Sequence, residues 1–198
     1  MNSVERSLID AVGALRGVGA RSALVGGLAV SARAEPRLTR DADFAVAVGS
    51  DEDAERVVRA LIAEGYALLA AVEQEAVGRL ATVRLTRATD EHSTVTDLLF
   101  ASSGIEPEIV DAADDIEILP GVVVRVATIG HLIATKLLAR DDRSRPTDAD
   151  DLRALAGRAV DVDWCEAEIA VALITARGFA RGRDLEGSLA QLRTDGAY

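Results

Sequence analysis

The alternation of apolar and polar residues predicts a chain that begins as a mixture of helices and strands and ends as helices alone. Leu8, Val12 and Leu15 recur at the spacing of one helix face, and the apolar run 22–25 is bounded by glycines, which is typical of a buried strand. From about Thr128 onward only helical periodicity is present. This order predicts an α/β (α+β) fold with a mixed β-sheet core, flanking helices and a helical C-terminal part.

Capping, turn and breaker residues set the limits of these elements. We expect strands at 22–25, 40–48, 67–72, 80–85 and 94–100, followed by a hairpin of 116–119 and 122–126. We expect helices at 3–17, 28–34, 51–65 (capped by Asp51) and 106–113, and four more that begin near residues 128, 147, 161 and 184. We therefore divide the chain into a core, 1–127, and a helical part, 128–198, packed on that core.

Composition narrows the class of protein. Of the 198 residues 49% are hydrophobic, but only one Trp, two Tyr and three Phe are present, so the core must be aliphatic. A formal net charge of −11 argues against a generic nucleic-acid binder, although a local basic patch stays open. The single Cys165 excludes an internal disulfide and fits a reducing cytosol. No signal peptide is recognisable and no apolar stretch approaches the ~20 residues of a membrane span, so we expect a cytoplasmic protein.

Two aspartates stand one residue apart on the strand expected at 40–48. Residues i and i+2 of a strand point to the same face about 6.5–7 Å apart, so Asp41 and Asp43 aim two carboxylates at one place. Carboxylates held this close repel unless a cation lies between them, and Mg²⁺ is often held by such a pair together with substrate phosphates. A solvated strand edge with two acids is the alternative interpretation of this short motif.

The sequence around these acids resembles a known signature. Gly26-Gly27, a short helix and then Arg37-Leu-Thr39-Arg-Asp41-Ala-Asp43 is similar to the signature of the DNA polymerase β-like nucleotidyltransferases. Among them, the closest resemblance is to the abortive-infection (AbiE-type) toxins, and it covers roughly residues 5–155. The resemblance implies transfer of a nucleotide from an NTP to an acceptor hydroxyl. For toxin-like members it also implies RNA such as tRNA as the acceptor and a cognate antitoxin as a partner.

The same resemblance assigns a metal site. Two Mg²⁺ or Mn²⁺ ions ~3.5–4 Å apart can clamp the attacking and leaving oxygens of such a reaction. We expect Asp41 and Asp43 to bind both ions, and Asp97, an acid in the otherwise apolar strand 94–100, to bind the catalytic one. The alternative for Asp97 is an acid at the edge of a strand.

The Gly26-Gly27 turn is expected to let the backbone approach the triphosphate at the N-terminus of the following helix. Gly27 has no hydroxyl where many members of the superfamily have Ser, so only backbone contacts are expected from it. We assign Arg37 and Thr39 to nucleotide binding. Arg37 either binds a phosphate bidentately or neutralises the acidic cluster from outside.

A second constellation lies in the helical half. Lys136, followed by Asp148-x-x-Asp151-Leu, resembles a Lys…Asp-x-x-Asp-Leu region of the same toxins. A lysine in an apolar helix needs an anion. We count Lys136 among the catalytic and nucleotide-binding residues, with a phosphate as its partner. The alternative is a salt bridge to Asp148 or Asp151, which share a helix face and which we interpret as mainly structural.

The remaining candidates are weaker. Neither His131 nor His92 has other metal-ligand residues at a suitable spacing in the sequence, so both are expected to be solvated or structural. Basic residues near the C-terminus form either a solvated helix face or the positive surface that an RNA acceptor would need; these are Arg177, Arg181, Arg183 and Arg193.

Two other functions compete with an RNA-modifying enzyme. One is transfer to a small molecule, as in aminoglycoside nucleotidyltransferases, and the other is a non-catalytic nucleotide-binding or interaction module on the same fold. Geometry separates the enzyme from the module. In an enzyme the three carboxyl groups should converge on one cation-sized space beside Gly26. An Asp97 turned away, or a basic side chain already filling that space, would remove the enzyme and leave only the architecture.

Overall fold

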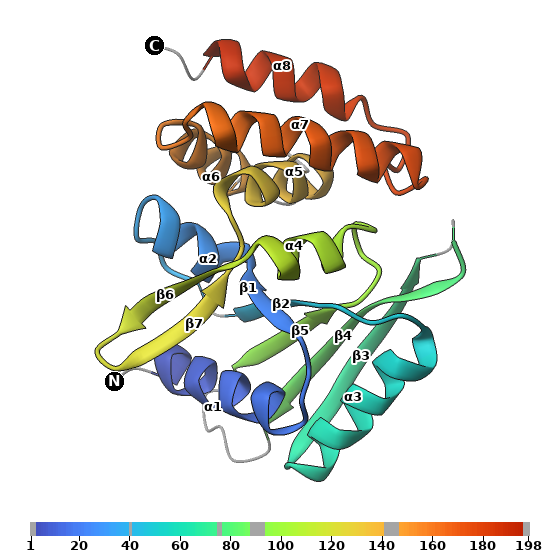
Figure 1. Cartoon of the computed structure of the whole chain (residues 1–198). Helices are drawn as coiled ribbons and strands as arrows, with labels where there is room; N and C mark the ends of the chain where they lie inside the picture. Colours follow the sequence, from blue (N-terminus) through green and yellow to red (C-terminus); the bar gives the residue numbers. More distant parts are fainter. Residues whose placement is uncertain (1–2, 40, 75–76, 88–93, 141–146, 196–198) are drawn as a thin grey trace.

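A computed structural model describes residues 3–39, 41–74, 77–87, 94–140 and 147–195 (Figure 1). Arg40 lies outside the described residues, as do residues 88–93 of the charged turn that we expect at 87–93, with His92, and most of the loop before residue 147.

The described chain contains both helices and strands up to residue 126 and is helical from Ile129 onward. The helices are α1 (Ser3–Gly17), α2 (Gly26–Arg33), α3 (Asp51–Ala63), α4 (Glu106–Ala112), α5 (Ile129–Ala139), α6 (Thr147–Ala156), α7 (Asp161–Ala176) and α8 (Leu185–Asp195). The strands are β1 (Ser22–Val25), β2 (Asp41–Val46), β3 (Tyr66–Gln74), β4 (Arg79–Arg87), β5 (Val95–Leu99), β6 (Asp114–Leu119) and β7 (Val122–Val126).

The described strands form one mixed seven-stranded sheet in the order β3-β4-β5-β2-β1-β7-β6. Two neighbouring pairs are parallel, β2 with β5 and β1 with β7, and the other pairs are antiparallel. The parallel pairing of β2 with β5 matters for function, because it sets the two acid-bearing strands side by side at the centre of the sheet. The predicted α/β fold class is confirmed.

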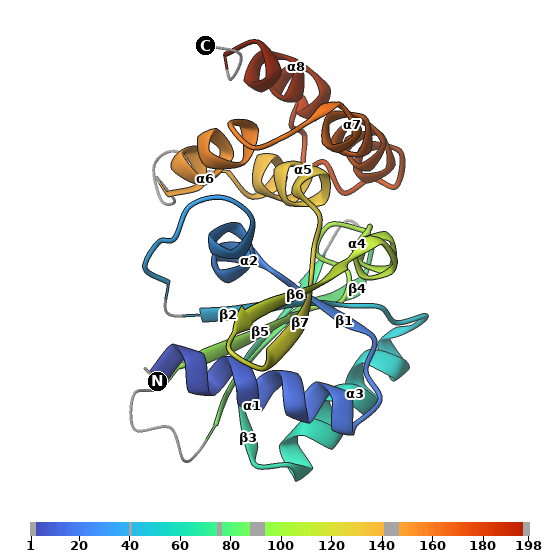
Figure 2. The ribbon, with the colours of Figure 1, turned by 60° about the vertical axis from the view of Figure 1, so that its left-hand side comes forward.

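Helices cover both faces of the sheet. α1 and α3 lie on one face, α2 and α4 on the other, and α5–α8 stack beyond α2 and α4 (Figures 1 and 2). The side chains of Leu24, Phe44 and Leu98 are at most 1% exposed and belong to an aliphatic core. α5 joins the layers, because it packs against α2 as well as against α6, α7 and α8. The division at residue 127 stays a prediction.

Local differences from the predicted elements have identifiable causes. α2 begins at Gly26 itself, because Gly26 and Gly27 form its first turn and not a separate loop. β3 and β4 are longer than expected, since their antiparallel pairing from Tyr66↔Arg87 to Gln74↔Arg79 continues beyond the apolar residues. The predicted cap at Asp51 is wrong. The cap is Ser50, whose side chain accepts a hydrogen bond from the amide of Asp53.

Candidate functional site

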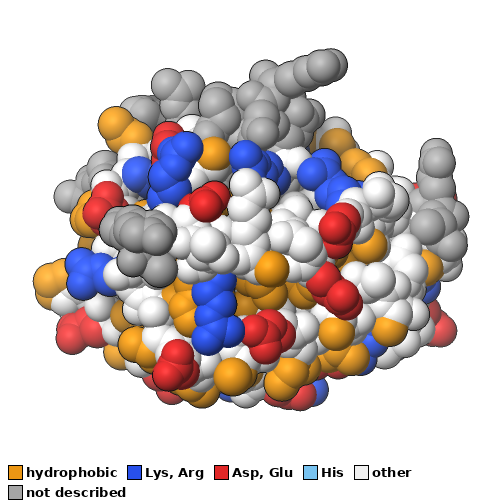
Figure 3. All heavy atoms as spheres, turned by 90° about the horizontal axis from the view of Figure 1, so that it is seen from above, with side chains coloured by type: hydrophobic (Ala, Val, Ile, Leu, Met, Phe, Trp, Pro, Cys, Tyr) orange, Lys and Arg blue, Asp and Glu red, His pale blue; other side chains and the backbone are white. Residues whose placement is uncertain are grey.

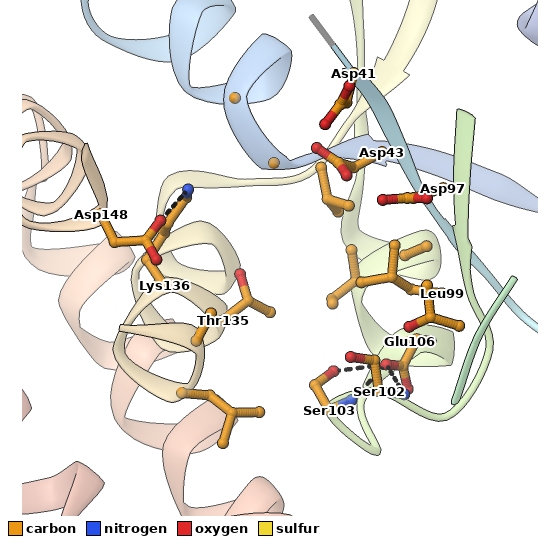
Figure 4. A pocket seen from close by; sticks show the side chains of 18 of the residues that line it. Asp41, Asp43, Asp97, Leu99, Ser102, Ser103, Glu106, Thr135, Lys136 and Asp148 are labelled. Atoms are coloured by element: carbon orange, nitrogen blue, oxygen red, sulfur yellow. Dashed lines mark hydrogen bonds and ion pairs between the residues drawn. The ribbon is translucent and has the colours of Figure 1, made fainter. Parts of the chain in front are cut away.

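A cavity of about 650 Å³ lies between the sheet and the helical part. All the residues that the sequence assigned to the site line this cavity, namely Gly26, Gly27, Arg37, Thr39, Asp41, Asp43, Asp97 and Lys136. Figure 4 shows the three aspartates on one wall and Thr135, Lys136 and Asp148 on the wall opposite. Residues distant in the sequence therefore meet around one space.

The sheet places the acids by register. Asp43 on β2 and Asp97 on the parallel strand β5 are direct partners, and adjacent strands lie ~4.8 Å apart. Asp41 is two residues from Asp43 and shares its face, while Ala42 and Phe44 are buried on the other face. Asp97 is not turned away, since it lies beside Asp43 in the cavity wall (Figure 4).

Both glycines of the turn allow a close contact. Gly26 has a φ of +63°, and a Cβ on it would lie 1.9 Å from Oδ2 of Asp43. Glycine is needed there for its backbone conformation and for space. A Cβ on Gly27 would lie 2.6 Å from a guanidinium nitrogen of Arg37 and 2.9 Å from the hydroxyl of Thr39. The turn therefore fits against the aspartate of β2 on one side and against the segment before β2 on the other.

The sequence did not identify the partner of Asp97. Arg84 on β4 donates from Nε to Oδ1 at 2.9 Å and from Nη2 to Oδ2 at 2.7 Å. Asp97, with Asp41 and Asp43 nearby, raises the pKa of the Arg84 guanidinium. Within the described ranges, no group of three His, Cys, Asp or Glu side chains could hold a metal ion as it stands. The three carboxylates line one cavity, but the structure differs from the expected cation-sized space between them, because the basic side chain of Arg84 already binds Asp97.

The helix side of the cavity is a closed ionic network. Lys136 is 6% exposed, and its Nζ lies 2.7 Å from Oδ1 of Asp148 and 2.6 Å from Oδ2 of Asp151. Arg37 also binds Asp151, with Nε 2.6 Å from Oδ1 and Nη2 2.9 Å from Oδ2. Lys136 thus has the salt bridges that were the structural alternative. Arg37 binds an aspartate of α6, a partner that neither interpretation of Arg37 included.

A buried glutamate, which sequence reasoning treated only as the start of a helix, orders the loop below the acids. Glu106 is 1% exposed and accepts hydrogen bonds from the backbone amides of Ser102, Ser103 and Gly104. Burial raises the pKa of Glu106, and these hydrogen bonds oppose that rise. The Ser103-x-x-Glu106 spacing is that of a capping box and could have revealed this loop.

The C-terminal arginines are held by acids and carbonyl oxygens. Arg177 donates to Glu108 at 2.6 Å, Arg181 to the carbonyl of Ser102 at 2.9 Å, Arg183 to the carbonyl of Arg140, and Arg193 to Glu168 at 2.9 Å. On the face seen in Figure 3, basic and acidic side chains are interspersed over the described residues. They do not form the continuous positive surface expected of an RNA-binding face.

The fold of this chain is similar to that of solved nucleotidyltransferases. An antigenic nucleotidyltransferase-like protein from Paracoccidioides brasiliensis is 17% identical, with a TM-score of 0.54 over 95% of this chain and 92% of that one. The lincosamide antibiotic adenylyltransferase LnuA in its lincomycin-bound form is 14% identical, with a TM-score of 0.52 over 80% and 100%. The antibiotic-resistance factor ANT(2'')-Ia is 15% identical, with a TM-score of 0.50 over 98% and 92%. At these identities the likeness establishes a nucleotidyltransferase fold.

The family follows from the sequence match. The model of the family described as "Nucleotidyl transferase AbiEii toxin, Type IV TA system" matches residues 13–196, and the chain belongs to that family. The predicted resemblance to AbiE-type toxins is thereby confirmed. A search of curated proteins gives no match. Among the described helices, none has both the length and the apolar character that a membrane crossing requires.

Proposed function

We propose that this protein transfers a nucleotide from an NTP to an acceptor hydroxyl, with Asp41, Asp43 and Asp97 as the acids of the reaction. The observation that carries the proposal is the register of the sheet. It sets Asp43 beside Asp97 and directly over the Gly26 turn, in a cavity large enough for a nucleotide. Family membership and fold support transferase activity in general. The roles of individual residues are part of the proposal.

The carboxylates of Asp41, Asp43 and Asp97 are chemically suitable ligands for a divalent metal ion. Carboxylate oxygens are the hard ligands that Mg²⁺ and Mn²⁺ take, and Asp41 and Asp43 would hold such ions from β2, with Asp97 joining once Arg84 releases it. When bound, two ions would neutralise charge on the attacking and leaving oxygens. Any of the three carboxylates left without a metal bond is also placed to accept the proton of the acceptor hydroxyl.

The triphosphate would lie at the N-terminus of α2. The residue before α2, Val25, makes no side-chain cap hydrogen bond to the helix. Backbone amides at a helix start attract anions, and Gly26 and Gly27 allow close approach. Lys136 and Arg37 border the same space, where their positive charges would act through the field of the cavity while their direct partners stay the aspartates of α6.

The acceptor is proposed from the family. A toxin of a toxin-antitoxin system implies RNA such as tRNA as the acceptor and a cognate antitoxin as the partner. One structural neighbour adenylylates lincosamides, which makes a small molecule the second candidate. The net charge of −11 and the interspersed surface charges weigh mildly against a large RNA interface.

Label transfer tests the function. Wild type, Asp41→Ala and Asp115→Ala would be incubated with each α-³²P-labelled NTP and Mg²⁺, in separate arms containing total RNA, aminoglycosides with lincosamides, or no added acceptor. Asp115 is an exposed aspartate of β6 outside the cavity and serves as the control. Transfer by wild type and Asp115→Ala, but not by Asp41→Ala, is the expected result. Equal labelling by all three proteins would contradict the catalytic role of the acids.

The non-catalytic alternative keeps one observation in its favour. Arg84 already neutralises Asp97, as a binding module without turnover would require. The enzyme and the non-catalytic module predict different fates for an NTP that binds in the presence of Mg²⁺ and acceptor. An enzyme releases pyrophosphate in the presence of its acceptor, whereas a module retains the intact NTP.

A further inference from the structure

Arg84 is held differently from the other basic residues that line the cavity. Arg37 and Lys136 bind the nearly inaccessible carboxylate of Asp151, which the substrate cannot displace without breaking the core. The partner of Arg84 is Asp97, one of the proposed metal ligands. The Arg84 side chain is 48% exposed, whereas that of Asp97 is only 9% exposed, so the guanidinium lies on the solvent side of the pair.

We propose that Arg84 is a latch. In the substrate-free protein it occupies both oxygens of Asp97, and on binding of the metal-triphosphate complex it releases Asp97 and binds a phosphate group. This inference rests on the proposed function, since it needs a triphosphate and a divalent ion in this cavity. It adds a nucleotide-binding residue and a self-blocked resting state.

Charge is the first argument for the latch. Asp41, Asp43 and Asp97 lie close together on neighbouring strands, where carboxylates repel unless positive charge lies among them, and Arg84 supplies such a charge to Asp97. A divalent ion supplies more positive charge at the same oxygens, so it competes directly with Arg84 for Asp97. The positive charge of Arg84 also opposes entry of a metal ion while the guanidinium stays beside the acids.

Geometry is the second argument. β4 pairs with β5 so that Arg84 and Asp97 are direct cross-strand partners, and Thr82 two residues earlier lines the cavity as well. The backbone of Arg84 therefore stays in the cavity wall when the side chain releases Asp97, so the guanidinium can still reach a ligand in the cavity. Guanidinium groups bind phosphate oxygens through the same two-pronged geometry that they use for carboxylates, so one side chain can serve both partners.

Binding of Mn²⁺ and of inorganic triphosphate tests the latch without relying on activity. Binding of Mn²⁺ alone would be measured from free Mn²⁺ by electron paramagnetic resonance, and binding of the Mn²⁺-triphosphate complex by isothermal titration calorimetry, for wild type, Arg84→Met and Arg84→Lys. Arg84→Met should bind Mn²⁺ alone about tenfold more tightly, because a competing positive charge is gone. It should bind the Mn²⁺-triphosphate complex about tenfold more weakly, because a phosphate ligand is gone. Arg84→Lys keeps the charge but not the two-pronged contact, so both of its affinities should lie between those of wild type and Arg84→Met.

Arg79→Met is the matched control. Arg79 also lies on β4 and also binds an aspartate, Asp51, at 2.6 Å, but outside the cavity. The Arg79→Met variant should bind Mn²⁺ and the Mn²⁺-triphosphate complex as wild type does. If Asp43→Asn weakens Mn²⁺ binding while Arg84→Met and Arg84→Lys bind as wild type does, the latch is wrong and the proposed metal site stands. If wild type binds no Mn²⁺ with or without triphosphate, the latch and the metal-dependent function both fail.

Discussion

Two ionic clusters face each other across the cavity, and they differ in charge balance and in exposure. The strand cluster consists of Asp41, Asp43, Asp97 and Arg84. The helix cluster consists of Arg37, Lys136, Asp148 and Asp151. The strand cluster has more acids than bases and is partly open to the cavity, whereas the helix cluster is balanced, with two buried aspartates each 1% exposed.

The difference separates chemistry from architecture. A balanced and buried network is complete without a ligand, and removing one member leaves a buried charge alone. An acidic and accessible cluster gains from added cations, which is what a metal-dependent transfer needs. The strand cluster should therefore control activity with little effect on folding. The helix cluster should control mainly folding, and it should affect activity directly only through the positive charges of Lys136 and Arg37 at the cavity.

Removing an acid of the strand cluster should have the largest effect. Asp43→Ala is expected to lower nucleotidyl transfer by on the order of 10³-fold, because charge on the leaving oxygens loses its stabilisation. Its unfolding free energy should stay within about 1 kcal/mol of wild type, since one repelling carboxylate is removed. Label transfer and urea unfolding would measure the two quantities. Asp115→Ala is the control, and a variant that loses activity only because it unfolds would contradict the assignment.

The helix cluster should respond in the opposite way. Asp151→Ala is expected to lower the unfolding free energy by about 3–5 kcal/mol, because Lys136 and Arg37 lose their shared buried partner. Asp150→Ala on the same helix is the control, since Asp150 pairs with Arg153 on the surface with 76% of its side chain exposed. That variant should change stability by less than about 0.5 kcal/mol. Equal effects in thermal or urea unfolding would remove the structural role of the network.

A side chain at the Gly26 turn should disturb the strand cluster locally. Gly26→Ala is expected to lower transfer about 100-fold, because its Cβ would displace the carboxylate of Asp43. Gly121→Ala is a matched control with a φ of +77° and nothing within 4 Å of the added Cβ. Both variants should lose about 1 kcal/mol of stability from backbone strain. Loss of activity in both would indicate that strain, and not the contact with Asp43, is responsible.

The smallest effect concerns a half-exposed ion pair between α4 and the end of α7. The hydrogen bond from Arg177 lowers the pKa of Glu108 below its ordinary value of 4.5. Because the folded pKa is depressed, this pair stabilises the protein above pH ~4.5 and is lost as the pH falls through the folded pKa. Arg177→Met should lower stability by about 0.5 kcal/mol at pH 7 and by less at pH 3. Urea unfolding of wild type and Arg177→Met at pH 7 and pH 3 measures this loss of stability. The same loss at both pH values would contradict the prediction.

The sequence was sufficient where local periodicity decides the structure. The alternation through Asp41, Ala42, Asp43 and Phe44 fixes which side chains share a face, and Thr128 caps α5 as expected. The resemblance to the AbiE-type toxins placed the glycines, the acids and Lys136 around one site, and the cavity brings them together.

The sequence was insufficient where a partner depends on strand order or on packing between layers. Arg84 binds Asp97 because β4 is the neighbour of β5, and the alternation of the strand gives no partner for Arg84. Arg37 follows α2, and Asp151 lies in α6, 114 residues further along the chain. The two side chains meet because α6 packs against α2. Burial of Glu106 likewise depends on the loop that it organises. The contacts of Arg84 and Arg37 join different elements, and composition and spacing do not encode them, whereas the local Ser103-x-x-Glu106 spacing was available in the sequence.

Anomalous diffraction from crystals grown with Mn²⁺ and non-hydrolysable NTP analogues would locate the proposed metal and triphosphate sites. We expect manganese peaks ~2.2 Å from oxygens of Asp41 and Asp43, with the triphosphate against the amides of Gly26 and Gly27. Manganese or triphosphate bound away from these residues would contradict the proposed sites.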